Sequence, residues 1–569
     1  MQIRGYIERE KEIFETPVTI AEGLEFDFPR TLRKTELYYN SKFMGGERDS
    51  DGFKKIFFNI NKRPVKTSQK SVDIDTKDIQ VQAEEGGSDI QAWFLEKELL
   101  QFMKEENFGE FLNDVVERYP KYGEVVVKNV KGKPKVVSLH NLRYDPQLHI
   151  EDSPWVHEEH LYTIEEFQNT AEELGWDKDA VEEVLALYKS NDIATIGVIE
   201  RYGYYEERDL VDGGGDTLSP GVVICAGFDR ELQKKKKEVP TIILHKQELD
   251  VFPYRSLSWE SIDHRGIGVG VVEENFEAQE FYNDVNNKER KALEWNTRKL
   301  FRSSDPNVPK NLFRTKRNGD VIESRDFTEI PMAERNLAQF NALYQRIINN
   351  SDGTSFTFEV NTGESLPSGT PFRLGAILSN ATDSYFNFKR EKLGLFITGI
   401  IEDFIIPEFK KKKRKGHIFS FTAEADEMNK FDLLMTNAIL KKEMDKFVKK
   451  NGVYPLPQHV EAERMKIMEK LRQRDERFPE LPDKFYDNIK TKIKIVITGE
   501  NSNTATDLTT LTSLYTVLSE QQDPRAEKVL NQILSLAGTN PIGLLGLSTG
   551  MAMGGGTQQL QVVAPVGQE

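Results

Sequence analysis

The middle of the chain, residues 263–409, constrains the fold most, because long helical patterns there carry few apolar residues. The first pattern runs from Glu274 to Arg302, with acidic residues early and basic residues late, the order that complements a helix dipole. Its apolar residues are too few for burial on all sides; they are Phe276, Phe281, Val285, Leu293 and Leu300. A helix of this length spans roughly 40 Å and needs neighbours on its flanks. Identical copies arranged in a ring would supply them.

A turn-rich insert, residues 303–331, follows this helix. Asn318-Gly319 lies between short extended runs and is a strong local signal for a β-hairpin. Four basic residues surround the hairpin, namely Lys310, Arg314, Lys316 and Arg317. They suit either plain solvation or the docking of a partner protein.

A second helix is expected at 332–349, with one apolar stripe, and Thr354–Val360 reads as extended. A Gly/Ser/Thr/Pro loop then leads to a third, longer helix. Thr370 is its expected cap, Pro371 its first residue, and Pro407 its end. Gly394 and Gly399 are expected bending points inside it, since glycine weakens a helix.

A basic run follows the third helix and comprises Lys410, Lys411, Lys412, Lys413, Arg414 and Lys415. Charge runs of this kind are usually solvated, and bases are favoured after a helix end. The alternative is contact with DNA or with an acidic partner surface.

The flanking regions predict an α+β fold. Before the middle, a helical pattern covers 90–116, a hairpin covers Glu124–Leu139, and a helix covers Glu165–Ser190. Strands are expected at Thr195–Tyr205, Gly221–Phe228 and Thr241–His245. After the middle come helices at 425–448 and 460–477, a strand at 492–497, and helices at 507–520 and 525–537.

The 569-residue chain has a formal net charge of −16, so its surface as a whole does not attract nucleic acid. The single cysteine, Cys225, excludes an internal disulfide and is expected to be a small buried residue in a strand. We find no apolar run of membrane-spanning length and no signal peptide at the N-terminus. A protein made in the cytoplasm, without membrane attachment, is expected.

Motifs for catalysis or cofactor binding are not evident, so neither an enzyme nor a cofactor is predicted. The sequence lacks a phosphate-binding loop of the GxxxxGK[ST] form. Gly266, Gly268 and Gly270 do not fit a dinucleotide fingerprint, and we expect them to permit tight turns and close packing. His157 and His160 are three residues apart, not the four that a zinc-binding helix needs, and are expected in a solvated acidic turn.

Taken in order, these features resemble the portal protein of tailed bacteriophages over roughly residues 50–540. The matching features are the hairpin that ends at Tyr144-Asp145-Pro146, the glycine-rich approach 265–270 to a helix with Gln279 and Asn283, the insert, the second helix, the loop and the long helix. The resemblance rests on the order of these features.

The resemblance implies an α+β ring subunit with a mixed α/β wing, a two-helix stem, a small β-containing clip, a long helix after a tunnel loop, and a helical crown. The implied segments are 1–262 for the N-terminal part of the wing, 263–302 for the first stem helix, 303–331 for the clip, 332–350 for the second stem helix, 351–372 for an extended segment and the tunnel loop, 373–500 for the long helix and C-terminal wing, 501–548 for the crown, and 549–569 for a disordered tail.

Members of that family form a ring, twelve-fold in the virion, at one capsid vertex. The resemblance implies double-stranded DNA in the channel, with the terminase large subunit, the major capsid protein and head–tail connector or tail proteins as partners. The tunnel loop facing the DNA would contain Thr362, Gly363, Glu364, Ser365, Ser368, Gly369 and Thr370. Small, uncharged or negative groups let a duplex slide, because fixed cations add affinity for every phosphate they neutralise.

Two other interpretations stay open. One is another ring-forming virion component such as a connector or neck protein, although connectors are usually much smaller than this chain. The other is an enzyme acting on nucleic acid, whose catalytic carboxylates could hide among the 93 acidic residues.

Overall fold

The computed structural model describes residues 3–48, 52–74, 76, 79–83, 89–210, 215–235, 239–297, 300–302, 304, 328–330, 338–357, 372–412, 417–418, 425–451, 455–473, 480–481, 491–495, 511–516 and 529. The chain divides into two compact units. The first contains Met1–Thr76 and Gln101–Lys411, and the second contains Lys77–Leu100 and Lys412–Glu569. This division joins segments far apart in the sequence rather than following consecutive blocks.

The first unit is built on a five-stranded antiparallel sheet with the order β10-β9-β8-β7-β6. Its strands are β6 (Leu142–Tyr144), β7 (Val156–Thr163), β8 (Thr195–Glu206), β9 (Leu218–Ala226) and β10 (Ile242–Glu248). The strands predicted at 195–205, 221–228 and 241–245 are therefore confirmed within a few residues. Cys225 is buried in β9, as expected.

A smaller sheet, β11-β4-β5, lies in the same unit and contains β4 (Glu124–Val130), β5 (Lys133–Val137) and β11 (Tyr254–Ser258). β4 and β5 are the predicted hairpin. Its turn is Lys131-Gly132, and both residues have positive φ, the pattern of a two-residue hairpin turn. A short pair, β1 (Val18–Ala21) and β2 (Leu24–Phe26), completes the N-terminal part.

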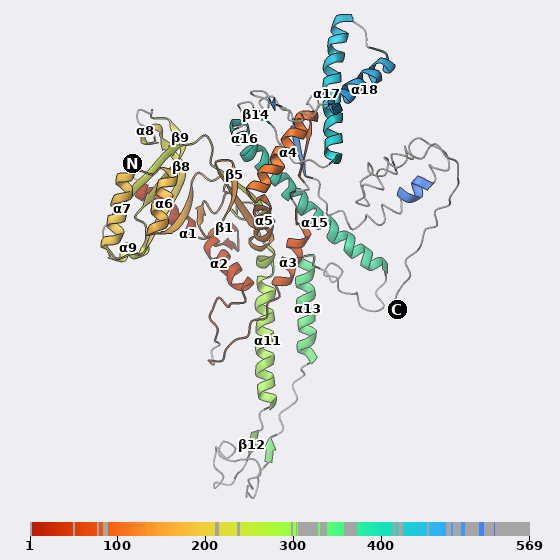
Figure 1. The fold of residues 1–569 in the computed structure, drawn as a ribbon. Helices are drawn as coiled ribbons and strands as arrows, with labels where there is room; N and C mark the ends of the chain where they lie inside the picture. Colours follow the sequence, from red (N-terminus) through yellow and green to blue (C-terminus); the bar gives the residue numbers. More distant parts are fainter. Residues whose placement is uncertain are drawn as a thin grey trace. The chain divides into compact units, whose positions relative to one another are not determined.

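Helices cover the large sheet (Figure 1). One face carries the main apolar core, shared by β6–β10, the strands of the hairpin and the helices α6 (Ile164–Leu174) and α7 (Lys178–Ser190). The other face packs against Ile3 and Ile7 of α1 (Ile3–Glu15). The single helix expected at 165–190 is two helices, because Gly175 is left-handed and Asp177 caps a new helix.

Several further helices belong to the first unit, namely α2 (Phe28–Tyr39), α3 (Lys62–Ser71), α5 (Phe108–Tyr122), α8 (Glu207–Leu210) and α9 (Arg230–Lys235). Asp27 caps α2 by accepting a hydrogen bond from the Arg30 amide at 2.9 Å. The pattern predicted at 90–116 is also two helices, α4 (Asp89–Glu105) and α5, separated at Asn107, which has positive φ.

Two helices of the middle region run side by side (Figure 1). α10 (Val271–Glu274) leads into α11 (Phe276–Thr297), and α13 (Ala338–Thr354) returns beside it. The first helix was expected to reach Arg302. It ends earlier, because β12 (Leu300–Arg302) pairs antiparallel with β13 (Thr328–Ile330) at the far end of the helix pair. Thr354, predicted to be extended, is the last residue of α13.

The long helix is α15 (Phe372–Ile400), which continues through a π-helical turn, Ile401–Ile405, into α16 (Ile406–Lys412). The prediction that Pro407 ends it is wrong. The amide of Ile406 bonds back to the carbonyl of Ile401, and this wider turn lets the chain continue past the proline. The π turn starts just after Gly399, one of the expected bending points.

The second unit contains α17 (Ala425–Asn451) and α18 (Pro457–Gln473), which are in contact, and most of α4. Its strands form two antiparallel pairs, β3 (Ile79–Ala83) with β16 (Thr491–Ile495) and β14 (His417–Ile418) with β15 (Glu480–Leu481). Trp93 of α4 packs on Phe431 of α17 with ring centroids 5.2 Å apart. These contacts explain why residues 77–100 join the C-terminal part.

The fold of the described residues is thus mixed helix and strand, with every pair of named strands antiparallel. None of the helices in the described part of the chain is long and apolar enough to cross a membrane. Residues 511–516, inside the expected helix at 507–520, are helical. The expected helix at 525–537, apart from residue 529, and the tail 549–569 lie outside the described residues.

Candidate functional site

The α11–α13 pair starts from a tight backbone contact. Gly123, which follows α5 with φ +80°, lies against the chain before α10. A Cβ on Gly268 would lie 2.3 Å from the Gly123 oxygen, and one on Gly270 would lie 2.5 Å from the Gly123 nitrogen. Real side chains do not fit at such distances, so the glycines permit close packing, as predicted.

An extended segment, residues 52–61, lies along α11 and is called the strap. The strap bonds to three amide side chains of α11 through alternate backbone N–H groups. The Ile60 amide donates to Gln279 Oε1 at 2.9 Å, the Phe58 amide to Asn283 Oδ1 at 3.0 Å, and the Ile56 amide to Asn287 Oδ1 at 3.3 Å. The strap therefore runs in the direction opposite to α11.

These three regularly spaced hydrogen bonds, called the amide ladder, follow from the repeat of the helix and the repeat of the extended chain. Gln279, Asn283 and Asn287 are four residues apart, which is about 6.0 Å along a helix, and two residues of extended chain advance about 6.6 Å. Gln279 also donates to the Phe58 carbonyl at 2.5 Å, so both ends of its amide are used. The amides turn one flank of α11 into a template for extended backbone.

A second flank of α11 faces α13. Tyr282 and Tyr344 meet with ring centroids 5.0 Å apart, and Val285 of α11 and Ile347 of α13 are buried. The Tyr344 hydroxyl donates to Glu289 of α11. Burial and this carboxylate raise the pKa of Tyr344, which keeps the hydroxyl protonated as a donor.

The third flank of α11 is open in the single chain. Its residues, Glu277, Phe281, Asp284 and Lys288, are all exposed. They recur at intervals of four, three and four, so they form one stripe. Phe281 is 49% exposed, although a phenyl ring gains from burial. Asp284 pairs with Lys288 at 2.6 Å.

The exposed side of α13 differs in chemistry. It carries amides rather than acids, namely Gln339, Asn341, Gln345, Asn349 and Asn350. Arg346 is the one exposed charged residue among the described residues of this helix, and Asp352 is half-buried. A surface of amides forms hydrogen bonds without presenting fixed charge.

Glu260, Glu274 and Lys389 gather where α10 and α15 meet. Lys389 of α15 donates to the Trp259 carbonyl at 2.6 Å and contacts Glu260 at 3.2 Å. The Tyr385 hydroxyl also donates to Glu260, at 3.1 Å. Burial, with a smaller contribution from the Glu260 charge, raises the pKa of Glu274 to about 8. The base of the helix pair thus holds a carboxyl that titrates near neutral pH.

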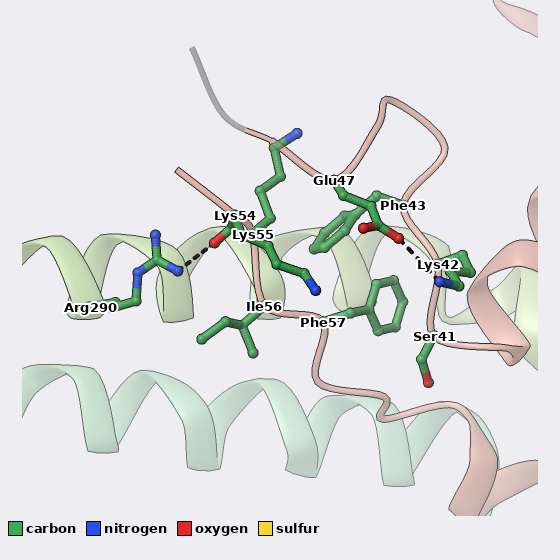
Figure 2. A pocket seen from close by; sticks show the side chains of 9 residues that line it. All are labelled: Ser41, Lys42, Phe43, Glu47, Lys54, Lys55, Ile56, Phe57 and Arg290. Atoms are coloured by element: carbon green, nitrogen blue, oxygen red, sulfur yellow. Dashed lines mark hydrogen bonds and ion pairs between the residues drawn. The ribbon is translucent and has the colours of Figure 1, made fainter. Parts of the chain in front are cut away.

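A pocket of about 510 Å³ opens beside the strap and α11 (Figure 2). It is lined by Ser41, Lys42, Phe43, Glu47, Lys54, Lys55, Ile56, Phe57 and Arg290. Arg290 reaches from α11 to the Lys54 carbonyl at 2.5 Å, and Lys42 pairs with Glu47 at 3.1 Å. The lining thus contains four cationic side chains and one carboxylate, together with aromatic and aliphatic groups.

The expectation that His157 and His160 lie in a solvated turn is wrong, because both belong to β7. His157 is buried and contacts Glu10 of α1 at 2.8 Å. Arg201 of β8 donates two hydrogen bonds to the same carboxylate, at 2.6 and 2.8 Å. Burial alone would raise the pKa of Glu10, but hydrogen bonds from Arg201 and His157 outweigh it and lower that pKa.

Glu158, His160 and Glu200 come close enough together to hold a metal ion. Lys128 of β4, however, lies between the two carboxylates, 2.5 Å from Glu158 and 2.6 Å from Glu200. Hydroxyls of Tyr254 and Tyr202 donate to the same two carboxylate oxygens. His160 and Lys128 hold the pKa of Glu200 at about 2, against the effect of burial. The ammonium group thus supplies the positive charge that a cation would bring, and we read the cluster as a buried ion-pair network.

Most predicted site residues fall outside the described residues. These are the loop residues Thr362, Gly363, Glu364, Ser365, Ser368, Gly369 and Thr370, the insert residues Lys310, Arg314, Lys316 and Arg317, and the run residues Lys413, Arg414 and Lys415. Lys410, Lys411 and Lys412 form the end of α16, where Lys411 is exposed and lies 3.9 Å from Glu408. Lys410 is half-buried. The loop and insert sites therefore stay predictions, and of the basic run the described residues include only Lys410, Lys411 and Lys412.

Sequence reasoning missed the strap. Gln279 and Asn283 were noticed, but only as parts of a resemblance. The usable signal was three amide side chains spaced four residues apart on one helix flank, which indicates a polar partner on that flank.

A scan of family models and a search of curated proteins both find no match to the chain.

Proposed function

We propose that this chain is a portal subunit, and that copies of it form a ring whose α11–α13 pairs surround a channel for double-stranded DNA. One observation carries the proposal. α11 has three flanks, of which the strap and α13 cover two, and the third keeps an aromatic side chain in solvent. A neighbouring copy beside that flank would bury it.

The arrangement of elements supports the same proposal. An antiparallel helix pair that ends in a two-stranded β-pair, followed by a helix of 29 residues, follows the order expected for stem, clip and long helix. The body of sheets and helices before the pair corresponds to the expected wing. Residues 300–302, which were expected at the end of the first stem helix, form a strand, so the proposed stem helix would end before them.

A channel through which DNA passes needs a wall that does not bind the DNA tightly. The exposed side of α13 offers amides and a single arginine, so a duplex beside it would neutralise few phosphates on fixed cations. The net charge of −16 adds general repulsion. We therefore place α13 at the channel and α11 towards the outside of the ring.

Electron microscopy of the purified full-length chain tests the proposal. We expect rings with a central hole wide enough for duplex DNA, with the mass of about twelve copies by light scattering. A compact monomer at micromolar concentration would contradict it. Binding of the ring to a terminase large subunit then separates a portal from another ring-forming connector, and metal-dependent DNA cleavage would favour an enzyme instead.

Glu364 gives a second test. We expect Glu364→Lys to stall DNA packaging by adding a cation to the loop that would meet the duplex, while the rings still assemble. The matched control is Glu183→Lys, which makes the same change of charge at an exposed position of α7. Unaltered packaging in the Glu364 variant would remove the loop from the channel.

A further inference from the structure

The strap-covered flank and the open flank of α11 differ in charge. At 100° per residue, the strap-binding amides and the open stripe of Glu277, Phe281, Asp284 and Lys288 lie about 130° apart around the helix. The α13 flank occupies the remaining sector. Each helix pair therefore has two lateral sides, one formed by the strap and one by the stripe.

The strap side is cationic and apolar. Ile56 and Phe58 are 43% and 48% exposed, although their backbone N–H groups are bound to α11. Lys54 is exposed beside them, and Lys55 and Arg290 line the same pocket. Figure 2 shows the two lysine side chains leaving the strap in different directions, one upward beyond α11 and one across the front of it.

The stripe side carries acidic and aromatic groups that complement the cationic strap side. Glu277 and Asp284 flank Phe281 on the exposed surface of α11, and the one cation of the stripe, Lys288, is already paired with Asp284. An aromatic side chain between two carboxylates fits a pocket of about 510 Å³ that has phenyl groups and cations in its lining.

We infer that the strap side of one copy docks on the stripe of α11 in the next copy, with Phe281 entering the pocket beside Lys54 and Lys55. The partner is a second copy of this chain. The two surfaces are different, so the contact is head to tail, and such contacts generate rings when the rotation between copies closes. This inference rests on the proposed ring and specifies which surfaces build it.

Mixed crosslinking tests the contact directly. Ile56→Cys and Phe281→Cys are made as separate variants, mixed during assembly, and treated with a short bismaleimide, so that any product between these two positions joins different copies. Native Cys225 is buried and serves as the background in the wild type. The matched control mixes Ile56→Cys with Lys189→Cys, an exposed position of α7.

We expect the covalent dimer from the Ile56/Phe281 mixture to exceed the control mixture at least about tenfold. Rings that form but give no more dimer than the control overturn the inference and leave the proposed function intact. Absence of rings from the wild-type protein overturns both.

Charge reversal gives an independent test. We expect Lys54→Glu with Lys55→Glu to lower the fraction of chain in rings about tenfold, by placing acids opposite acids. Adding Glu277→Lys and Asp284→Lys should restore the rings, because the signs again oppose. The control, Lys178→Glu with Lys189→Glu, changes the same net charge on α7 and should assemble normally. Folding of each variant is checked by circular dichroism, and folded reversal variants that assemble like the wild type contradict the contact.

Discussion

The β-sheet body around β7 and β8 encloses its charged side chains, whereas the α11–α13 pair keeps charged and aromatic side chains on an open flank. In the body, Glu10 is held by Arg201 and His157, and Lys128 is held by two glutamates. On the open flank, Phe281 and Glu277 meet solvent. The body thus pairs these charged groups within one chain, whereas this flank of α11 stays exposed to solvent in the single chain.

Because of this difference, charged pairs should contribute differently to the stability of the two regions. Removing one partner of a buried ion pair leaves the other charge without compensation, so the body should be sensitive to single substitutions. Exposed pairs such as Asp284–Lys288 contribute little in one chain, and their value would appear only when copies assemble.

Glu10→Ala should have the largest effect. It leaves Arg201 and His157 buried without their carboxylate, and we expect the free energy of unfolding to fall by about 3–5 kcal/mol. Urea unfolding followed by circular dichroism measures it. The control is Glu8→Ala in the same helix, where the carboxylate is exposed and pairs with Arg4 at 3.3 Å; about 0.5 kcal/mol is expected there. Equal effects would mean that the body does not depend on its buried charges.

The junction at Glu274 should give the next effect, as a dependence on pH. Because its folded pKa, about 8, exceeds the value of 4.5 for a free glutamate, the folded state retains a proton that the unfolded state releases. Stability from this group is therefore complete below pH 4.5 and is lost as pH rises through about 8. We expect the free energy of unfolding to fall by up to about 1.4 kcal/mol per pH unit between pH 6 and 8.

Glu274→Gln should remove that slope, since the amide does not titrate. Glu277→Gln, one turn further along and exposed, should keep it. Thermal unfolding of the three proteins at several pH values provides the measurement. A slope that survives in Glu274→Gln assigns the titration to another group.

The strap ladder should give the smallest of the three effects. Asn283→Ala leaves the Phe58 amide without its acceptor, at an expected cost of about 1–2 kcal/mol. Hydrogen exchange of residues 54–60 should speed up about tenfold or more, while exchange in β8 stays unchanged. Gln345→Ala, an exposed amide on α13, is the control and should leave the strap protected. Unchanged exchange would show that the strap is held by its other contacts.

Sequence patterns predicted the local features well. The β4–β5 hairpin was readable because Lys131-Gly132 separates two β-branched runs, and Cys225 because it sits in an apolar run. The close packing at Gly268 was also expected. Each of these depends on residues near in sequence.

Features built by distant residues were not readable. His157 looked solvated, because its partners Glu10 and Arg201 lie 147 and 44 residues away along the chain. The strap bonds to α11 across more than 200 residues, so no local pattern reveals it. Pro407 was misread because the π turn that accommodates it depends on the hydrogen bonds of the preceding turn. The predicted loop and insert sites stay predictions.

In the ladder of amide hydrogen bonds, the repeat of the helix and the repeat of the strap differ in length. The difference is about 0.6 Å, so each further rung falls more out of step. The hydrogen bonds lengthen accordingly, from 2.9 to 3.0 to 3.3 Å between Gln279 and Asn287. Arg290, three residues after Asn287, has a longer and more adaptable side chain and donates to the Lys54 carbonyl. Inserting one residue into the strap would put every later hydrogen bond of the ladder out of register.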